Sequence, residues 1–539
     1  MNSAILTLVT FIPAAGAILL MLMPRNDKSI RWTALFISLL AFAFSLYLPF
    51  GYHAGQTGFQ FEINHPWIGQ AIHYHMGADG ISMWLVLLTT FLVPLGVLGS
   101  WKSIHDRVKE FFVLFLLLET AMIGVFLALD LFLFYVFWEA TLIPMALLIG
   151  MYGHERRIYA AIKFFLYTMV ASVFMLAAVI WLYTHAGTFD YEGIRNWLAA
   201  GHANAEAIKW LFLGFFIAFA VKVPLFPLHT WLPDAHVEAP TAGSLLLASV
   251  LLKMGTYGLL RFNVGLFPAE AQRHAPWINT LAIIGIIYGA LVALVQPNLK
   301  KLIAYSSVSH LGFVVLGIFT FTQAGTDGAV YQMLNHGIST GALFMLAGML
   351  YERKHTYELR EYGGLASPMP IFATFFMIAV LSSVGLPLLN GFVGEFLVLS
   401  GAFQAKVIYG VLAASGVIWS AAYLLWMYQR VFYGPIRHQE NRTVPDIGGR
   451  EQISLWPLAV MAIVMGVASP LFMKSIDASV GEMNKKELSS HSMSGSGSNL
   501  MGASSSHGNS GDYGNSVNPV GSSVNAVNPK PSLIQRAKK

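Results

Sequence analysis

The chain has 539 residues, of which 56% are hydrophobic and only 11% are charged, and its mean hydropathy is +0.61. A soluble domain carries about 25% charged residues, so this composition excludes an ordinary soluble protein and predicts an integral membrane protein. The chain contains no cysteine, which excludes disulfides, thiolate metal sites and iron–sulfur clusters on it. The net charge of +5 is not gathered into a run of Lys and Arg, so we expect no nucleic-acid partner.

Apolar runs of about 20 residues, the length that crosses the hydrocarbon core of a lipid bilayer, recur along almost the whole chain. They predict an all-α polytopic membrane protein with about fourteen transmembrane helices. The predicted spans cover residues 3–23, 31–50, 80–100, 111–129, 131–151, 159–184, 208–228, 240–262, 277–296, 301–320, 328–351, 369–403, 410–433 and 453–473.

The first predicted span lacks the basic segment and the cleavage site of a secretory signal, so we expect it to be retained. Most basic loop residues fall on one side of the predicted spans, and by the positive-inside rule that side faces the cytoplasm. We therefore expect the N- and C-termini on the opposite, outer side of the membrane.

Two spans share the same interruption, at Val221–Pro227 and at Val384–Gly391. Proline removes a helix hydrogen bond, and in lipid the freed carbonyl needs a partner in protein or in a hydrated cavity. Paired breaks predict an internal repeat with an ion path near the breaks, although two unrelated proline kinks would leave the same pattern. The expected parts are N-terminal helices in 1–110, five-helix repeats in 111–262 and 277–433, a last span at 453–473 and a disordered Ser/Gly/Asn-rich tail at 481–539.

Four ionisable residues lie inside predicted spans: Glu139, Lys222, Lys253 and Glu395. A charge at the bilayer centre costs about 2.5–3.5 kcal/mol on insertion scales, so it persists where it is paired, hydrated or functional. A Glu139–Lys222 pair can act as a switch, because moving the carboxylate would release a proton from the lysine. A static ion pair that only locks two helices is the alternative.

His310 and His336 lie on consecutive predicted spans, and imidazole has a proton affinity suited to relay near neutral pH. Their position between the intramembrane charges favours a relay over ordinary core histidines. Lys163 is a weaker candidate, because it is predicted near the end of a span and can reach the interface.

One loop contains four further polar side chains: His229, Asp234, His236 and Glu238. These are metal-ligating residue types, but their spacing matches no recognised metal site. We expect them to cap or gate the following helix, and we expect no metal.

Four strings then show a resemblance: FYVFWEATLIPM, FAVKVPLFPLHTWLPDAHVEAPTAGSLLLASVLLKMGTYGLLRF, LKKLIAYSSVSHLGFVVLG and LNHGISTGALFMLAGMLYER. They resemble the antiporter-like subunits of respiratory complex I and of multisubunit cation/proton antiporters. The resemblance implies about fourteen helices, two inverted five-helix repeats with broken spans 7 and 12, and proton translocation driven by quinone reduction elsewhere in the complex.

Carried onto this chain, the resemblance makes Glu139 and Lys222 the input pair, Lys253 the central lysine and Glu395 the exit residue. His310 and His336 correspond to the histidines of the central axis.

The related subunits L and N carry lysine in the second broken helix where this chain has Glu395, and we expect them as neighbours within the membrane. The resemblance places NADH, FMN, iron–sulfur clusters and quinone on partner subunits and no cofactor on this chain. The alternatives are a subunit of a Na⁺/H⁺ antiporter, a subunit of a proton-pumping membrane hydrogenase, and a structural spacer.

Overall fold

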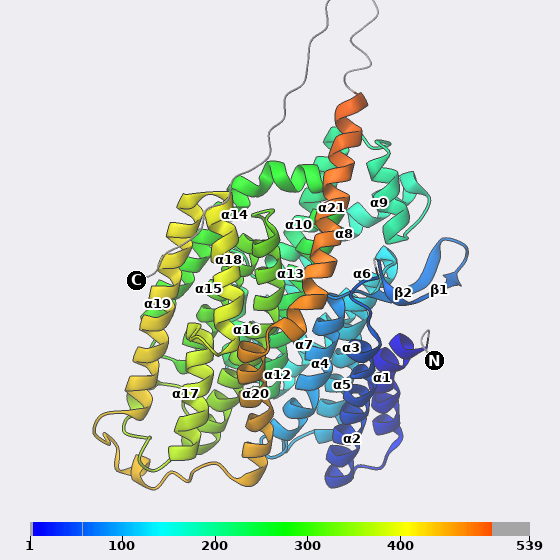
Figure 1. Cartoon of the computed structure of the whole chain (residues 1–539). Coiled ribbons are helices and arrows are strands. Elements are labelled where there is room, and N and C mark those ends of the chain that lie inside the picture. The colour runs from blue at the N-terminus through cyan, green and yellow to red at the C-terminus, as the bar shows by residue number, and fades with distance from the viewer. Residues whose placement is uncertain (1–3, 57, 498–539) are drawn as a thin grey trace, which may run out of the picture. The chain divides into compact units, whose positions relative to one another are not determined.

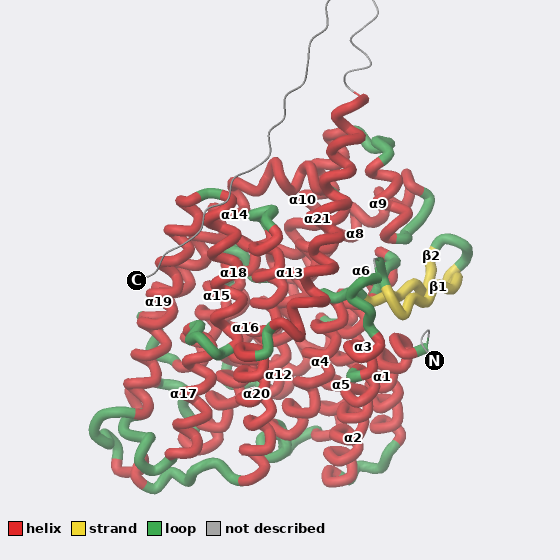
Figure 2. The backbone as a smooth tube through the Cα atoms, in the orientation of Figure 1, coloured by secondary structure: helices red, strands yellow, loops and turns green. Residues whose placement is uncertain are grey.

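The structure, a computed structural model, describes residues 4–56 and 58–497 and is almost entirely helical (Figure 1 and Figure 2). The N-terminal elements are α1 (Ile5–Leu22), α2 (Asp27–Ser45), α3 (Tyr47–Gly51), β1 (Gln60–Ile68), β2 (Ile72–Ala78), α4 (Ser82–Gly99), α5 (Val108–Leu127), α6 (Leu131–Ala140) and α7 (Leu142–Tyr152). There follow α8 (Arg157–Ala186), α9 (Tyr191–Ala199), α10 (Ala205–Lys222), α11 (Trp231–Glu238), α12 (Thr241–Leu246), η1 (Leu247–Leu251), α13 (Leu252–Gly258), η2 (Leu259–Val264) and α14 (Pro268–Leu294). The last elements are α15 (Leu299–Ile318), α16 (Gln323–Lys354), η3 (Leu359–Glu361), α17 (Pro370–Val384), α18 (Asn390–Ala405), α19 (Val407–Phe432), η4 (Gln439–Arg442), α20 (Gly449–Val467) and α21 (Pro470–Gly497).

The all-α polytopic fold is confirmed. Within the described residues, 11 helices are long and apolar enough to cross a membrane, or up to 12 if the bent pair α20 and α21 is one span. The remaining predicted spans are the interrupted ones. One ends as α10 at Lys222, before the first proline break, and the other is divided into α17 and α18 by the second break. Gly385 ends α17 with φ of 82°, a left-handed conformation that glycine adopts without strain.

Between α3 and α4 the chain forms a two-stranded antiparallel hairpin, β1–β2, which the hydropathy pattern did not predict (Figure 2). Single hydrogen-bonded bridges join Met76 to Ala128 and Asp130 to Asp190, so the hairpin and its neighbouring loops form one layer at the end of the helices. An isolated hairpin is only marginally stable, so its formation depends on contacts with distant parts of the chain that local sequence does not show.

The C-terminal region differs from the prediction in two ways. The predicted span 453–473 is divided between α20 and α21, which meet at an angle of 66° (Figure 1). The predicted disordered tail begins too early at residue 481, because α21 continues to Gly497. Ile476 and Val480 are fully buried one turn apart, and this apolar face stabilises the helix against the rest of the protein. The remainder of the predicted tail, residues 498–539, lies outside the described residues.

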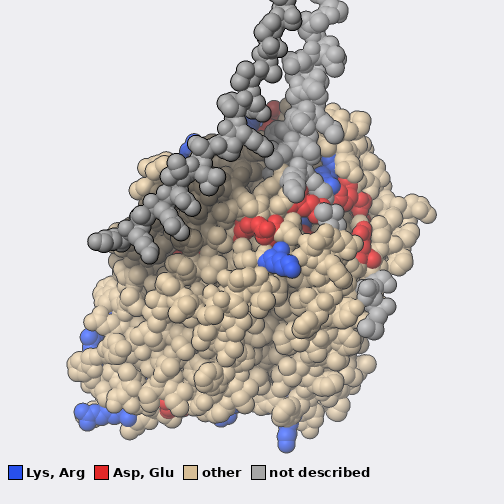
Figure 3. Space-filling view, viewed as in Figure 1, with Lys and Arg blue, Asp and Glu red and all other residues tan. Residues whose placement is uncertain are grey.

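The N-terminus, the hairpin and α21 lie at one end of the helices, here called the hairpin side. The hydroxyls of Thr7 and Tyr74 are 2.9 Å apart, and the Gly58 N–H donates to Glu482 at 2.7 Å. Figure 3 shows several Lys and Arg along the lower edge of the molecule, while most of the visible Asp and Glu gather in the upper half, where some Lys and Arg also lie. The opposite end, here called the basic side, contains the ion pairs Arg25–Glu110 and Arg353–Glu451.

Candidate functional site

Lys222 is the last residue of α10, and only 1% of its surface is exposed. Its ammonium lies 3.4 Å from Thr141 Oγ1, at the junction of α6 and α7. The same nitrogen lies 5.2 Å from the ring centre of Trp138 and 5.6 Å from that of Phe164. Cation–π contacts and one long hydrogen bond therefore surround a charge that burial would otherwise destabilise.

The expected partner of Lys222, Glu139, lies two residues before Thr141 on α6 and is partly buried. Among the described residues no direct ion pair joins Glu139 to Lys222, although the two charges attract each other at longer range. Oε1 of Glu139 is buried and, within the part of the chain that the structure describes, has no hydrogen-bond partner. The Lys222 ammonium thus contacts the Thr141 hydroxyl at the α6–α7 junction, and not the carboxylate of Glu139.

Lys253 is fully buried on α13 and makes two short contacts. Its ammonium donates to the Ala248 carbonyl at 2.6 Å and lies 2.6 Å from His336 Nδ1. Ala248 belongs to the π-helical segment η1, in which the wider turn leaves carbonyls available to side chains. The π-helix therefore provides an acceptor for a lysine in the interior of the membrane.

His336 on α16 and His310 on α15 continue the line from Lys253, with ring centres 5.9 Å apart. His310 Nδ1 lies 2.8 Å from Glu395 Oε1 on α18, and all three side chains are almost completely buried. The structure thus joins Lys253, His336, His310 and Glu395, which come from four helices, into one buried row.

Two side chains that the sequence analysis did not select complete this row. Gln332 Nε2 donates to Glu395 Oε1 at 2.9 Å, and the Tyr423 hydroxyl lies 3.3 Å from His310 Nε2. Gln332 stands four residues before His336, one turn away on α16, so helical periodicity could have selected it. Nothing in the local sequence marks Tyr423, which comes from α19.

The four polar residues of the loop near the first break do not converge. Asp234 forms an ion pair with Lys163 at 2.7 Å, and Glu238 accepts from the Arg156 N–H at 2.9 Å. The ring of His236 stacks on Phe344 at 4.3 Å between ring centres.

The fourth residue of that loop, His229, packs against Tyr288 with ring centres 5.2 Å apart. No group of three or more metal-ligating side chains comes together in residues 4–56 and 58–497. Each side chain of the loop therefore has its own surroundings, and the capping or gating role stays a prediction.

Lys300 is a further buried cation, fully enclosed at the start of α15. Its ammonium donates to the Ala239 carbonyl at 2.6 Å, beyond the end of α11. In the neighbouring α7–α8 loop, burial and the charge of Lys300 lower the pKa of His154 to about 4. The sequence analysis did not select Lys300, which stands next to a second lysine at the boundary of a predicted span.

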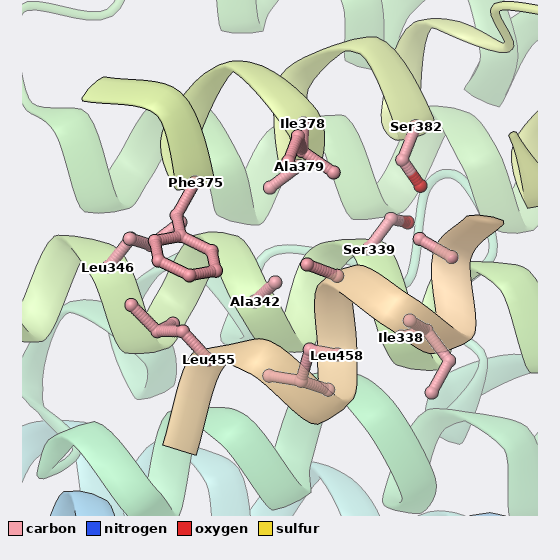
Figure 4. A pocket seen from close by; sticks show the side chains of 12 residues that line it. Ile338, Ser339, Ala342, Leu346, Phe375, Ile378, Ala379, Ser382, Leu455 and Leu458 are labelled. Atoms are coloured by element: carbon pink, nitrogen blue, oxygen red, sulfur yellow. The ribbon is translucent and has the colours of Figure 1, made fainter. Parts of the chain in front are cut away.

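The surroundings of the buried row are closely packed. Figure 4 shows a cavity between α16, α17 and α20, with Ser339 and Ser382 at one end and aliphatic side chains along most of its wall. Its volume is about 10 Å³, close to the lower limit of about 10–15 Å³ for one water. None of the four side chains of the row lines this cavity.

Two family descriptions match the chain. "NADH:quinone oxidoreductase/Mrp antiporter, TM" matches residues 128–420, and "NADH-ubiquinone oxidoreductase chain 4, amino terminus" matches residues 7–129. Together the two matches extend from α1 to α19 and include Lys253, His310, His336 and Glu395.

Individual proteins match over similar lengths. NADH-quinone oxidoreductase subunit M of Rhodobacter capsulatus is 47% identical over 494 residues, 89% of this chain and 96% of that protein. NADH-ubiquinone oxidoreductase chain 4 of Arabidopsis thaliana is 43% identical over 474 residues, 87% of this chain and 95% of that protein. A chain of respiratory complex I from Thermus thermophilus with bound NADH has a TM-score of 0.81 and 35% identity, covering 89% of this chain and 99% of that one.

Proposed function

Because the chain belongs to the NADH:quinone oxidoreductase/Mrp antiporter transmembrane family, we propose that it is a proton-translocating membrane subunit of an NADH:quinone oxidoreductase. The relatives that share more than 40% of its residues over most of their length are named as subunits of that enzyme. This similarity favours the oxidoreductase over the antiporter and hydrogenase alternatives.

The observation that carries the proposal is the buried row from Lys253 to Glu395. Each member is a group that can gain or lose a proton, and two contacts within it, Lys253–His336 and His310–Glu395, measure 2.6 Å and 2.8 Å. Buried ionisable groups are costly in a membrane, so four of them in sequence support a pathway rather than structural pairing.

The chemistry of the row follows from its contacts. The Lys253 ammonium donates its proton to neutral His336 Nδ1, and the imidazole releases a proton from its other nitrogen toward His310. The 5.9 Å between the two rings is bridged by a ring rotation or by one water. His310 then passes a proton through Nδ1 to the Glu395 carboxylate.

In this proposal Lys222 supplies the proton that Lys253 receives. The two lysines lie on helices in direct backbone contact. A Cβ atom built on Gly255 would lie 3.1 Å from the carbonyl carbon of Lys222 and 2.8 Å from the Val223 nitrogen. Movement of α10 at its proline break is therefore transmitted to the helix that carries Lys253. Glu139 adjusts the proton affinity of Lys222 through its charge, as its distance from the lysine changes.

We place the cytoplasm on the basic side and the periplasm of a bacterial inner membrane on the hairpin side, with both termini periplasmic. Protons then enter near Lys222 and leave near Glu395. The expected parts of the chain remain two inverted five-helix repeats, 111–262 and 277–433, flanked by the N-terminal helices. We propose subunits L and N as neighbours, and NADH, FMN, iron–sulfur clusters and quinone on partner subunits.

The test of this function is Lys222→Met in membranes that contain the whole complex. Methionine fills a similar volume without charge, and an uncharged side chain at a buried site is compatible with assembly. We expect proton pumping to be lost and NADH:quinone electron transfer to slow, because the two processes are coupled.

The matched control is Lys209→Met on the same helix, where the lysine is exposed and pairs with Glu206 at 3.5 Å. This variant should pump as the wild-type complex does. An assembled Lys222→Met complex with wild-type pumping would show that the lysine is structural and would support the spacer alternative.

A further inference from the structure

Arg261 lies two helical turns beyond Lys253 toward the hairpin side, within the π-helical segment η2. It is 96% buried and forms an ion pair with Asp79. Its Nε donates to the Tyr257 hydroxyl at 3.3 Å, and its guanidinium carbon lies 5.0 Å from the ring centre of Phe59. The guanidinium is therefore held on three sides.

Asp79 is itself fixed by backbone. Its Oδ1 accepts from the N–H groups of Ile81 at 3.1 Å and Ser82 at 2.8 Å, at the start of α4. Burial raises the pKa of Asp79, but the charge of Arg261 and these hydrogen bonds outweigh burial and lower it. The carboxylate is therefore ionised, and it holds the guanidinium in one place.

Tyr257 stands between Lys253 and Arg261, one turn from each. Its hydroxyl donates to the Phe126 carbonyl at 3.1 Å and accepts from Arg261, so both its proton and a lone pair are already engaged. A guanidinium has no lone pair that can accept a proton. On this face of the helix, no group among these residues takes a proton from Lys253.

Beyond the pair lies a polar cavity under α21, with a volume of about 30 Å³. Its walls include Asp79, Arg261, Arg195, Ser479 and Glu482. The volume exceeds the roughly 10–15 Å³ that one water needs, and the walls offer hydrogen-bond partners. Asp79 and Arg261 line this cavity, whereas Lys253 does not and is fully buried.

We propose that the Asp79–Arg261 pair is an electrostatic barrier that closes the outward side of Lys253, so that protons leave this lysine only through His336. The inference rests on the proposed function. Asp79 offsets the charge of the guanidinium at long range, but the guanidinium is the member of the pair that contacts Tyr257, so a proton coming from Lys253 meets the cation first. At a buried site salt does not screen that repulsion, and arginines exclude protons from pores in the same way. Without the barrier, protons would pass from Lys253 to the outside and bypass Glu395.

The test uses Arg261→Gln in sealed membrane vesicles that contain the whole complex. A pH step is imposed without NADH, the membrane potential is held at zero with K⁺ and valinomycin, and a trapped dye reports the internal pH. We expect the gradient to collapse at least twofold faster per complex than in wild type. With NADH present, electron transfer should continue with fewer protons pumped per NADH oxidised.

A second substitution separates a specific leak from loose packing. In the double variant Arg261→Gln and Lys253→Met the extra leak should disappear, because its proton donor is gone. Arg261→Lys keeps a cation but adds a group that can release a proton, so its leak should lie between those of the wild type and of Arg261→Gln. Arg195→Gln, on the wall of the same cavity, should leak no faster than wild type. Arg195 is not on the helix that carries Lys253, Tyr257 and Arg261.

An assembled Arg261→Gln complex that holds the gradient like wild type would overturn the proposal, and so would a leak that persists in the double variant. If Arg261→Gln does not assemble, Arg261→His tests the same point. Its proton leak should increase from pH 6 to pH 8, because the imidazole loses its charge over that range. A leak in Arg261→His that equals the wild-type leak at every pH would refute the barrier. Failure of the proposed function is seen separately, as pumping that survives Lys222→Met.

Discussion

Substitution of Gly255 by alanine tests the contact that joins the two lysine helices. The new Cβ would lie 2.8 Å from the Val223 nitrogen, 3.0 Å from the Phe219 carbonyl oxygen and 3.1 Å from the Lys222 carbonyl carbon. All three atoms belong to the backbone of α10 and its first following residue, so no side chain can turn away. We expect α10 to move from α13 and displace Lys222.

The magnitude follows from two opposing effects. Overpacking of a tight core costs about 1–3 kcal/mol, while replacing glycine by alanine inside a helix gains about 1 kcal/mol. Gly285→Ala on α14 is the matched control, because its nearest outside atom is Phe226 Cβ at 3.8 Å, an ordinary contact. Both variants gain the same helix stability from the change of glycine to alanine. Gly255→Ala should therefore be about 1–3 kcal/mol less stable than Gly285→Ala, because only Gly255→Ala overpacks the core.

The assay compares the thermal unfolding midpoint of the two purified complexes and their proton pumping at equal rates of NADH oxidation. Gly255→Ala should unfold at a lower temperature and pump less, while Gly285→Ala should match or exceed wild type in stability. Equal midpoints and equal pumping would refute the inference that this backbone contact positions Lys222.

Two further outcomes are expected. Glu395→Gln should assemble but pump about tenfold more slowly or worse, because losing the charge-assisted bond with His310 removes about 1.5–3 kcal/mol; wild-type pumping would place the exit elsewhere. His75 on the hairpin contacts Asp190 at 2.6 Å and Glu62 at 2.7 Å. Burial lowers the pKa of His75, but these carboxylates outweigh burial and raise it. Its stabilisation is therefore complete below about pH 6.5 and is lost as pH rises through the raised value. Proteolysis of the hairpin should accelerate at alkaline pH in wild type, and His75→Gln should remove that dependence.

The sequence by itself determined the membrane-spanning architecture and the breaks at the two proline motifs. These features are local: apolar length fixes a span, and proline removes a backbone donor wherever it stands. The same reasoning selected Lys253, His310, His336 and Glu395, because a charged or titratable side chain inside an apolar run is conspicuous without knowledge of its neighbours.

Only the tertiary structure decided which of these groups meet. Lys253 and His336 are 83 residues apart in the chain, and His310 and Glu395 are 85 apart, so their contacts depend on how four helices pack. Packing also set Thr141 beside Lys222, where an ion pair with Glu139 was expected. The Asp79–Arg261 pair joins residues 182 positions apart. Hydropathy and periodicity report each residue's own helix, whereas a proton path and its barrier are properties of the distances between helices.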